Sequence, residues 1–118
     1  MNKILVVDDD TDILGLVEIM LHSNNYDVKA ISRWQEISNS ILIFRPDLVL
    51  LDVSLGGADG REICKSIKLA KETKDLPVVL FSANPDMGKF IEDCQAQSFI
   101  AKPFEIKNLL GTISNLLN

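Results

Sequence analysis

The sequence predicts an α/β protein built on one doubly wound, five-stranded parallel sheet, with strand order 2-1-3-4-5 and helices on both faces. Strand-like apolar runs alternate with helix-like segments in five successive units. Three of the runs are continuously apolar, as strands are when helices cover both of their faces. Crossovers between parallel strands are right-handed, which places helices on both sides of such a sheet. Because 118 residues suffice for one core and not comfortably for two, we expect a single domain over residues 1–118.

The five expected strands are short runs of aliphatic and β-branched residues. They cover residues 3–7, 27–31, 48–51, 78–81 and 99–101. Pro46 and Pro77 each stand just before a strand, which fits a turn that leads into it. After the third strand, Gly56, Gly57 and Gly60 mark a loop.

The expected helices are marked by apolar residues that recur every three or four positions, so that one face of each helix can pack on the sheet. The five stripes are Ile13, Val17, Met20 and Leu21; Trp34, Ile37 and Ile41; Ile63, Ile67 and Ala70; Met87, Phe90, Ile91 and Cys94; and Ile106, Leu109, Leu110, Ile113 and Leu117. We interpret each stripe as core packing and not as a cofactor site. Pro103 is expected to open the last helix, because proline suits the first helical turn.

Composition and charge exclude several classes of function. The 17 acidic and 12 basic residues give a net charge of −5, which disfavours direct nucleic-acid binding because contact with phosphates needs a positive field. The longest apolar runs are a strand long, far below the roughly 20 residues that span a membrane, and Met1 is not followed by a leader pattern. We therefore expect a cytoplasmic protein without membrane contact. Cys64 and Cys94 are interpreted as reduced thiols on helices, because their number and spacing fit neither a disulfide framework nor a metal site.

Carboxylates follow two strands that the predicted order places side by side. Asp8 and Asp9 follow the first strand, and Asp52 follows the third. In a doubly wound sheet the ligand site lies outside the carboxyl ends of the strands, where the strand order reverses. Like charges so close together require a proton or a cation, and Mg²⁺ prefers carboxylate oxygens in an open site. For Asp10 and Asp12 we favour a different role, the capping of a helix N-terminus.

A hydroxyl and an ammonium group are expected at the same edge of the sheet. Ser82 follows the fourth strand and Lys102 follows the fifth. Because Lys102 precedes Pro103, its backbone is kept out of the helical region and extends from the strand end. A carboxylate nucleophile, a metal ion, a hydroxyl and an ammonium group together meet the needs of phosphoryl transfer, where charge on the phosphoryl oxygens must be neutralised.

Four segments at these strand ends resemble the receiver domains of two-component response regulators, which have a flavodoxin-like fold. They are residues 4–10 (ILVVDDD), 47–52 (DLVLLD), 79–83 (VLFSA) and 99–104 (FIAKPF), and the resemblance extends over essentially the whole chain. It implies that Asp52 is the phosphorylated residue. It also implies that Asp8, Asp9, Asp52 and the backbone carbonyl of Ser54 hold Mg²⁺, or Mn²⁺ in its place.

The same resemblance implies how the phosphoryl group is bound and sensed. Ser82 and Lys102 would each contact a phosphoryl oxygen, and the small side chain of Ala83 would leave the acceptor accessible. Phe99 matches the family's switch aromatic, which turns inward when Ser82 moves toward the phosphoryl group.

The implied function is that of a phosphoacceptor, which catalyses its own phosphorylation and dephosphorylation and is not otherwise an enzyme. The donor would be a sensor histidine kinase or a phosphotransfer protein, and the fourth helix, fifth strand and fifth helix would signal to a downstream protein or effector domain. Ser54 and Asn84 match the positions that set the phosphoryl lifetime, and because both are uncharged we expect appreciable self-dephosphorylation. The start at Met1 suits a free-standing or N-terminal receiver, and the sequence leaves the oligomeric state open.

Three alternative interpretations fit the residues less well. A phosphatase of the haloacid dehalogenase type would use Asp8 and Asp10, but it needs a longer chain with a cap and a second acidic pair. A calcium loop fits the alternation of Asp8, Asp10 and Asp12, but Ile13 and Ile19 stand where its glycine and glutamate belong. A pseudo-receiver, which keeps the fold as a binding module without the chemistry, is disfavoured by the intact acceptor, hydroxyl and lysine.

One departure from the family's pattern concerns the loop after Asp52. Gly56 stands where proline is common in receivers. Because glycine is more permissive than proline in φ, we expect this loop to be more mobile than in most receivers and metal binding to be weaker.

Overall fold

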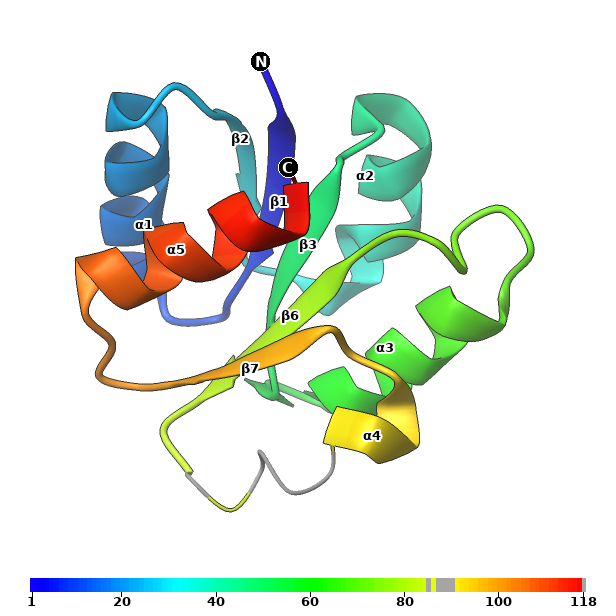
Figure 1. Ribbon diagram of the computed structural model, residues 1–118. Helices are drawn as coiled ribbons and strands as arrows, with labels where there is room; N and C mark the ends of the chain where they lie inside the picture. The colour runs from blue at the N-terminus through cyan, green and yellow to red at the C-terminus, as the bar shows by residue number, and fades with distance from the viewer. Residues whose placement is uncertain (85, 87–90, 118) are drawn as a thin grey trace.

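The computed structural model describes residues 1–84, 86 and 91–117. In these residues a five-stranded parallel sheet has the order β2-β1-β3-β6-β7, which confirms the predicted 2-1-3-4-5 arrangement (Figure 1). The strands are β1 (Lys3–Val7), β2 (Asp27–Ile31), β3 (Leu48–Asp52), β6 (Val78–Ser82) and β7 (Ser98–Ala101). Each expected strand is therefore present, and three of them are one residue longer than expected.

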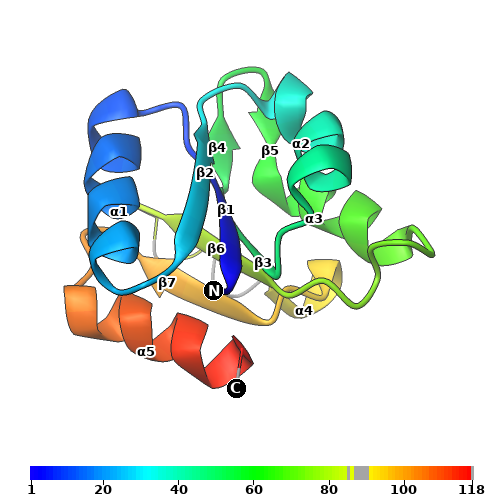
Figure 2. The same ribbon diagram turned by 90° about the horizontal axis from the view of Figure 1, so that it is seen from above.

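The helices lie on both faces of the sheet, as Figure 2 shows from above. They are α1 (Thr11–Ser23), a 3₁₀ turn η1 (Trp34–Glu36) that continues into α2 (Ile37–Phe44), α3 (Gly60–Leu69), α4 (Ile91–Cys94) and α5 (Ile106–Leu117). Two stripe residues expected in the fourth helix, Met87 and Phe90, lie outside the described residues. None of the helices described is long and apolar enough to cross a membrane.

Each face of the sheet contributes to its own apolar core, because side chains alternate along the strands. Ile4 and Val6 of β1 pack on one side with residues of α1 and α5, such as Val17 and Leu109. The other β1 residues face α2, α3 and α4, where the core includes Ile37, Ile67 and Cys94. With both faces covered, all five residues of β3 and of β6 are buried. The packing of the sheet on both faces holds the ends of the strands in place. The backbone positions of the polar residues that follow the strands are restricted as a result.

Local capping explains where two helices begin. The Asp10 carboxylate accepts hydrogen bonds from the backbone N–H groups of Asp12 (3.0 Å) and Ile13 (3.3 Å), so Asp10 caps α1 as expected. Asp59 caps α3 in the same way, by accepting from Arg61 N at 2.9 Å. Gly60, which we expected in a loop, is therefore the first residue of α3.

The structure corrects the predicted start of the last helix. Pro103 was expected to open it, but α5 begins at Ile106, and the peptide bond between Lys102 and Pro103 is cis. Residues 102–105 instead connect β7 to the helix. The Phe104 ring in this connection packs edge-on against Phe81, with ring centroids 6.4 Å apart, and this contact favours a connection over an earlier helical turn.

A short hairpin that the sequence did not predict follows β3. β4 (Ser54–Leu55) pairs antiparallel with β5 (Ala58–Asp59), and Gly56 and Gly57 form the two-residue turn between them. The hairpin leads directly into α3 and lies at the same edge of the sheet as the polar strand ends.

Candidate functional site

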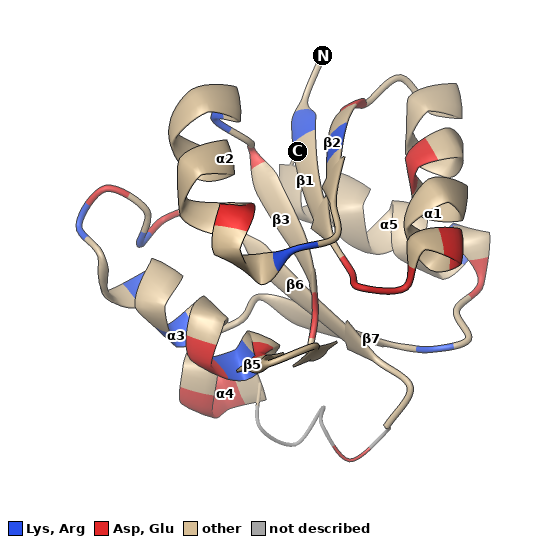
Figure 3. Ribbon diagram, turned by 180° about the vertical axis from the view of Figure 1, so that it is seen from behind, with Lys and Arg blue, Asp and Glu red and all other residues tan. Residues whose placement is uncertain are grey.

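A cleft of about 370 Å³ opens at the carboxyl ends of β1, β3 and β6. Its lining gathers residues that are far apart in the sequence: Asp8, Asp9, Asp10, Ile13, Asp52, Ser54, Ser82, Ala83, Asn84 and Lys102. Every site residue proposed from the sequence lines this cleft, with the exception of Phe99. Figure 3 shows acidic residues after β1 and at the end of β3.

Three carboxylates form the acidic side of the cleft. One oxygen from each of Asp8, Asp9 and Asp52 lies within 4.8 Å of the others. Asp8 is fully buried and Asp52 is 5% exposed, whereas Asp9 is exposed at the rim. A set of carboxylate oxygens that is partly open to water is the donor set that Mg²⁺ favours, so these residues fit that ion.

Lys102 lies between the two buried carboxylates. Its Nζ is 2.8 Å from Asp8 Oδ2 and 3.5 Å from Asp52 Oδ1. The same ammonium lies 4.4 Å from the centroid of the Phe81 ring, and the Lys102 backbone N–H donates to Ser82 O at 2.8 Å. These contacts hold the lysine just after β7 with its charge directed into the cleft, at the sheet edge where it was expected because it follows the fifth strand.

Burial and a neighbouring charge change the acidity of Asp52. Desolvation is the larger cause and the Asp8 carboxylate the next, and together they raise the pKa of Asp52 from 3.8 to about 6, although Lys102 acts in the opposite direction. The ionised form of Asp52 is thus destabilised, and a cation near it is favoured.

The remaining predicted residues surround Asp52 at different depths. The buried Ser82 hydroxyl accepts a hydrogen bond from Asn84 N at 3.0 Å, and Ser54 N donates to Asp52 Oδ1 at 3.4 Å. Ala83 and Asn84 are exposed, so they leave the mouth of the cleft accessible. Phe99 lies apart from the cleft on β7, half-buried, and packs against the core on the α3 and α4 side.

A contact that sequence reasoning missed joins the new hairpin to the acidic cluster. The backbone N–H of Gly56 donates a hydrogen bond of 3.1 Å to Asp9 Oδ2. The two residues are 47 positions apart, and a backbone amide leaves no signature in side-chain patterns. The only sequence signal was the glycine itself, at a position where proline would have no N–H to donate.

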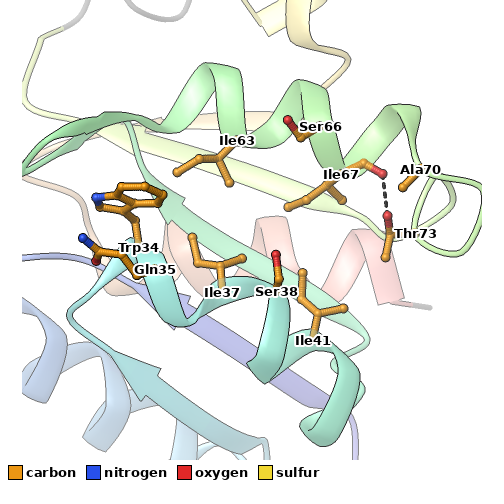
Figure 4. A pocket seen from close by; sticks show the side chains of 10 residues that line it. All are labelled: Trp34, Gln35, Ile37, Ser38, Ile41, Ile63, Ser66, Ile67, Ala70 and Thr73. Carbon is orange, nitrogen blue, oxygen red and sulfur yellow. Dashed lines mark hydrogen bonds between the residues drawn. The ribbon is translucent and has the colours of Figure 1, made fainter.

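Two other features take no part in this cleft. The thiol of Cys64 in α3 donates to the carbonyl of Cys94 at 3.3 Å, and burial raises the pKa of Cys64 to about 12. Neither cysteine forms a disulfide, and both lie on helices as expected. A separate hollow, with a volume of about 380 Å³, lies between α2 and α3. Figure 4 shows the side chains that line it, from Trp34 to Thr73. Its ten lining residues include no acid, base or thiol and offer no reactive group.

Comparisons with known proteins agree with the fold and with the position of the site. The family model described as the response regulator receiver domain matches residues 4–114. The transcriptional regulator RpaA of Synechocystis, described as DNA-binding, is 31% identical over 99% of this chain. This alignment covers 49% of RpaA, so the chain spans about half the length of that relative.

Two solved structures have the same architecture. The chemotaxis response regulator CheY4 of Vibrio cholerae superposes with a TM-score of 0.90 and 25% identity, over 99% of both chains. A CheY-like receiver domain protein of Methanospirillum hungatei gives a TM-score of 0.89 and 26% identity, over 99% of this chain and 94% of the other.

These findings place the chain among the signalling proteins of two-component systems, whose receiver domains are not classical enzymes. Within that class, it belongs to the response regulator receiver domain family.

Proposed function

We propose that residues 1–118 form a single receiver domain that accepts a phosphoryl group on Asp52 from a sensor histidine kinase or a phosphotransfer protein. The observation that carries the proposal is the position of Lys102, whose ammonium lies 2.8 Å from Asp8 and 3.5 Å from Asp52 in a cleft that Ser82 also lines. A nucleophilic carboxylate beside a fixed cation is the arrangement that phosphoryl transfer requires.

The proposed reaction moves a phosphoryl group from nitrogen to oxygen. An Asp52 carboxylate oxygen attacks phosphorus in line, the new O–P bond forms, and the P–N bond of the donor phosphohistidine breaks with the imidazole as leaving group. Lys102 and Ser82 then offer an ammonium and a hydroxyl to the phosphoryl oxygens. Since the Lys102 ammonium lies beside Asp52 before the reaction, it offsets the developing charge without reorganisation, whereas Ser82 moves toward the phosphoryl group after the transfer.

Asp8, Asp9, Asp52 and the backbone carbonyl of Ser54 would hold Mg²⁺, for which Mn²⁺ can substitute. When bound, the ion offsets negative charge on the phosphoryl oxygens. Asp8 and Asp52 are held by the ends of the buried strands β1 and β3, whereas Asp9 is held at the rim by the hairpin.

Signalling would depend on Ser82 and β7. Phosphorylation adds about −1.5 to −2 charge next to Lys102 and Ser82. We expect Ser82 to move toward the phosphoryl group and Phe99 to turn inward, because Ser82 pairs with Ala101 on the strand that also carries Phe99. This shift would change the face formed by α4, β7 and α5, which a downstream protein or effector domain would recognise. Ser54 and Asn84, beside the acceptor, would set the rate of self-dephosphorylation.

The charge of the domain and its proposed phosphoryl donor suggest what it contacts and where in the cell it acts. The net charge of −5 disfavours direct contact between this chain and nucleic acid. DNA binding in a relative such as RpaA would then belong to the part of that protein that this chain does not cover. Phosphoryl donors of this kind act in the cytoplasm, and we place the domain there.

Intact mass spectrometry after incubation with acetyl phosphate tests the proposal. We expect a labile gain of one phosphoryl group that requires both Mg²⁺ and Asp52, so that Asp52→Ala and a chelator each abolish it. A second readout, partner binding by the phosphorylated form with and without Phe99→Ala, tests the switch. If no phosphoryl group is gained under any condition while the domain is folded, the pseudo-receiver interpretation replaces this one.

A further inference from the structure

The turn of the β4–β5 hairpin has a backbone geometry that accepts either glycine or proline at position 56. Leu55 pairs with Ala58, so Gly56 and Gly57 are the two central residues of a tight turn. Gly57 has a φ of 84°, whereas Gly56 does not have a positive φ. These signs of φ are those of a type II turn, in which proline is common at the first central position. The family's usual proline at position 56 is thus compatible with this turn.

Gly56 differs from proline in one property that matters for the acidic cluster, because it has a backbone N–H. That N–H donates to Asp9 Oδ2 at 3.1 Å. Asp9 is the exposed member of the three carboxylates, and the buried Asp8 already has Lys102 as a partner. An exposed carboxylate rotates freely unless a partner holds it, so the amide restricts the ligand that would otherwise be the most mobile.

The hairpin is itself held in place from several sides. Gly60 N donates to Val53 O at 2.7 Å, and Asp59 is paired with Arg61 at 2.6 Å. At the turn, a Cβ on Gly57 would stand 3.7 Å from the indole nitrogen of Trp34, so the indole borders the turn. The Gly56 amide is therefore part of an anchored element and not of a free loop.

We propose that the Gly56 amide is a positioning group for the Mg²⁺ site. It holds Oδ2 of Asp9 and leaves Oδ1 free to face the other two carboxylates. The inference rests on the proposed Mg²⁺ site and adds to it a determinant of affinity that receivers with proline at this position lack. Partners that orient a metal-binding side chain typically change metal affinity by about 10 to 100-fold. This effect opposes the weaker binding that we expected from loop mobility alone.

Two substitutions at position 56 distinguish the effect of the amide hydrogen bond on Mg²⁺ affinity from the effect of loop stiffness. Gly56→Pro removes the N–H and stiffens the turn, while Gly56→Ala restricts the backbone and keeps the N–H. A Cβ at position 56 would lie 3.6 Å from Asp9 Oδ2, an ordinary contact distance, so alanine is accommodated. The Mg²⁺ dissociation constants of the two full-chain variants and of the wild type are measured by calorimetric titration. The fluorescence of Trp34, the only tryptophan, gives a second readout.

We expect Gly56→Pro to weaken Mg²⁺ binding about tenfold or more, and Gly56→Ala to remain within about threefold of the wild type. A proline variant that binds Mg²⁺ as well as the alanine variant, or more tightly than the wild type, would overturn the proposal in favour of loop stiffness. Circular dichroism and urea denaturation of each variant show whether it is folded. If Gly56→Pro is unfolded, the nitrogen-15 NMR signal of the Gly56 amide in the wild type decides, since it must shift on Mg²⁺ binding.

The same titration distinguishes this inference from the underlying site. A wild type that does not bind Mg²⁺, or that binds it as well after Asp9→Asn, refutes the proposed Mg²⁺ site itself. A wild type that binds Mg²⁺ through Asp9, with equal affinities in the proline and alanine variants, refutes only the role of the Gly56 amide.

Discussion

Replacement of Asp52 by asparagine is expected to stabilise the metal-free protein at neutral pH, although Asp52 is the proposed phosphoacceptor. Burial, followed by the charge of Asp8, raises the pKa of Asp52 from 3.8 to about 6. The folded protein therefore binds this proton more tightly than the unfolded chain does. The stability that comes from this proton is fully present below about pH 3.8 and is lost as the pH rises through 6.

The size of the effect follows from the shift. A rise of about two pKa units, at about 1.4 kcal/mol each, means that the ionised carboxylate costs about 3 kcal/mol of unfolding free energy. The attraction to Lys102 opposes the shift and is already contained in the value of about 6. Asparagine has nearly the same shape and does not ionise. We therefore expect Asp52→Asn to be about 2 to 3 kcal/mol more stable than the wild type at pH 7.5, and nearly equal to it at pH 4.

Urea denaturation in the presence of a chelator, followed by circular dichroism at pH 4, 6 and 7.5, measures this difference. Asp75→Asn is the matched control, because Asp75 is exposed and the same substitution there should change stability little at any of these pH values. Addition of Mg²⁺ should reduce the advantage of Asp52→Asn, since the ion binds and stabilises the wild type. The reasoning fails if Asp52→Asn is no more stable than the wild type at pH 7.5, or if its advantage is as large at pH 4.

Three further predictions follow from buried contacts. Lys102→Met leaves the fully buried Asp8 without its cation, so we expect a loss of about 3 to 5 kcal/mol at pH 7.5 by urea denaturation; a loss below 1 kcal/mol would show that the pair contributes little. Gly60→Ala would place a Cβ in a clash with the backbone carbonyl oxygen of Asp52, so we expect a loss of about 1 to 3 kcal/mol of unfolding free energy and slower phosphorylation by acetyl phosphate. Gly111→Ala, in α5 with open space around the new Cβ, is its control and should not destabilise the protein. The Cys64 thiol, with its pKa raised to about 12, should react slowly with iodoacetamide at pH 8 in the folded protein and rapidly in urea, and equal rates in the two states would contradict its burial.

The sequence predicted the sheet well because its strands are set by local patterns. Continuous apolar runs define β3 and β6, and Pro46 and Pro77 mark where these strands begin. The prediction that polar strand ends meet follows from the order of the strands alone, and the structure places Asp52 and Ser82 in one cleft.

Features that depend on tertiary contacts could not be predicted in this way. The β4–β5 hairpin has two residues in each strand, too few to show an alternating pattern, and its turn is bonded to Asp9, which is 47 residues from Gly56. The start of α5 was misplaced because Pro103 suits the first turn of a helix, while the packing of Phe104 on Phe81 favours a connecting segment. In both places a contact across the fold decides the local structure.

The position of β7 at the edge of the sheet has a mechanical consequence. Among the described strands, β7 is hydrogen-bonded to β6 on one side only, whereas β1, β3 and β6 each have two neighbours. Displacement of β7 therefore disturbs a single ladder, while displacement of an inner strand would disturb two. Phe99 lies within β7, and Lys102 of the cleft follows it directly. A displacement of β7 would therefore break fewer backbone hydrogen bonds than a displacement of an inner strand. Because an edge strand carries backbone groups that another chain can pair with, the proposed movement of β7 would reach a surface suited to binding a partner.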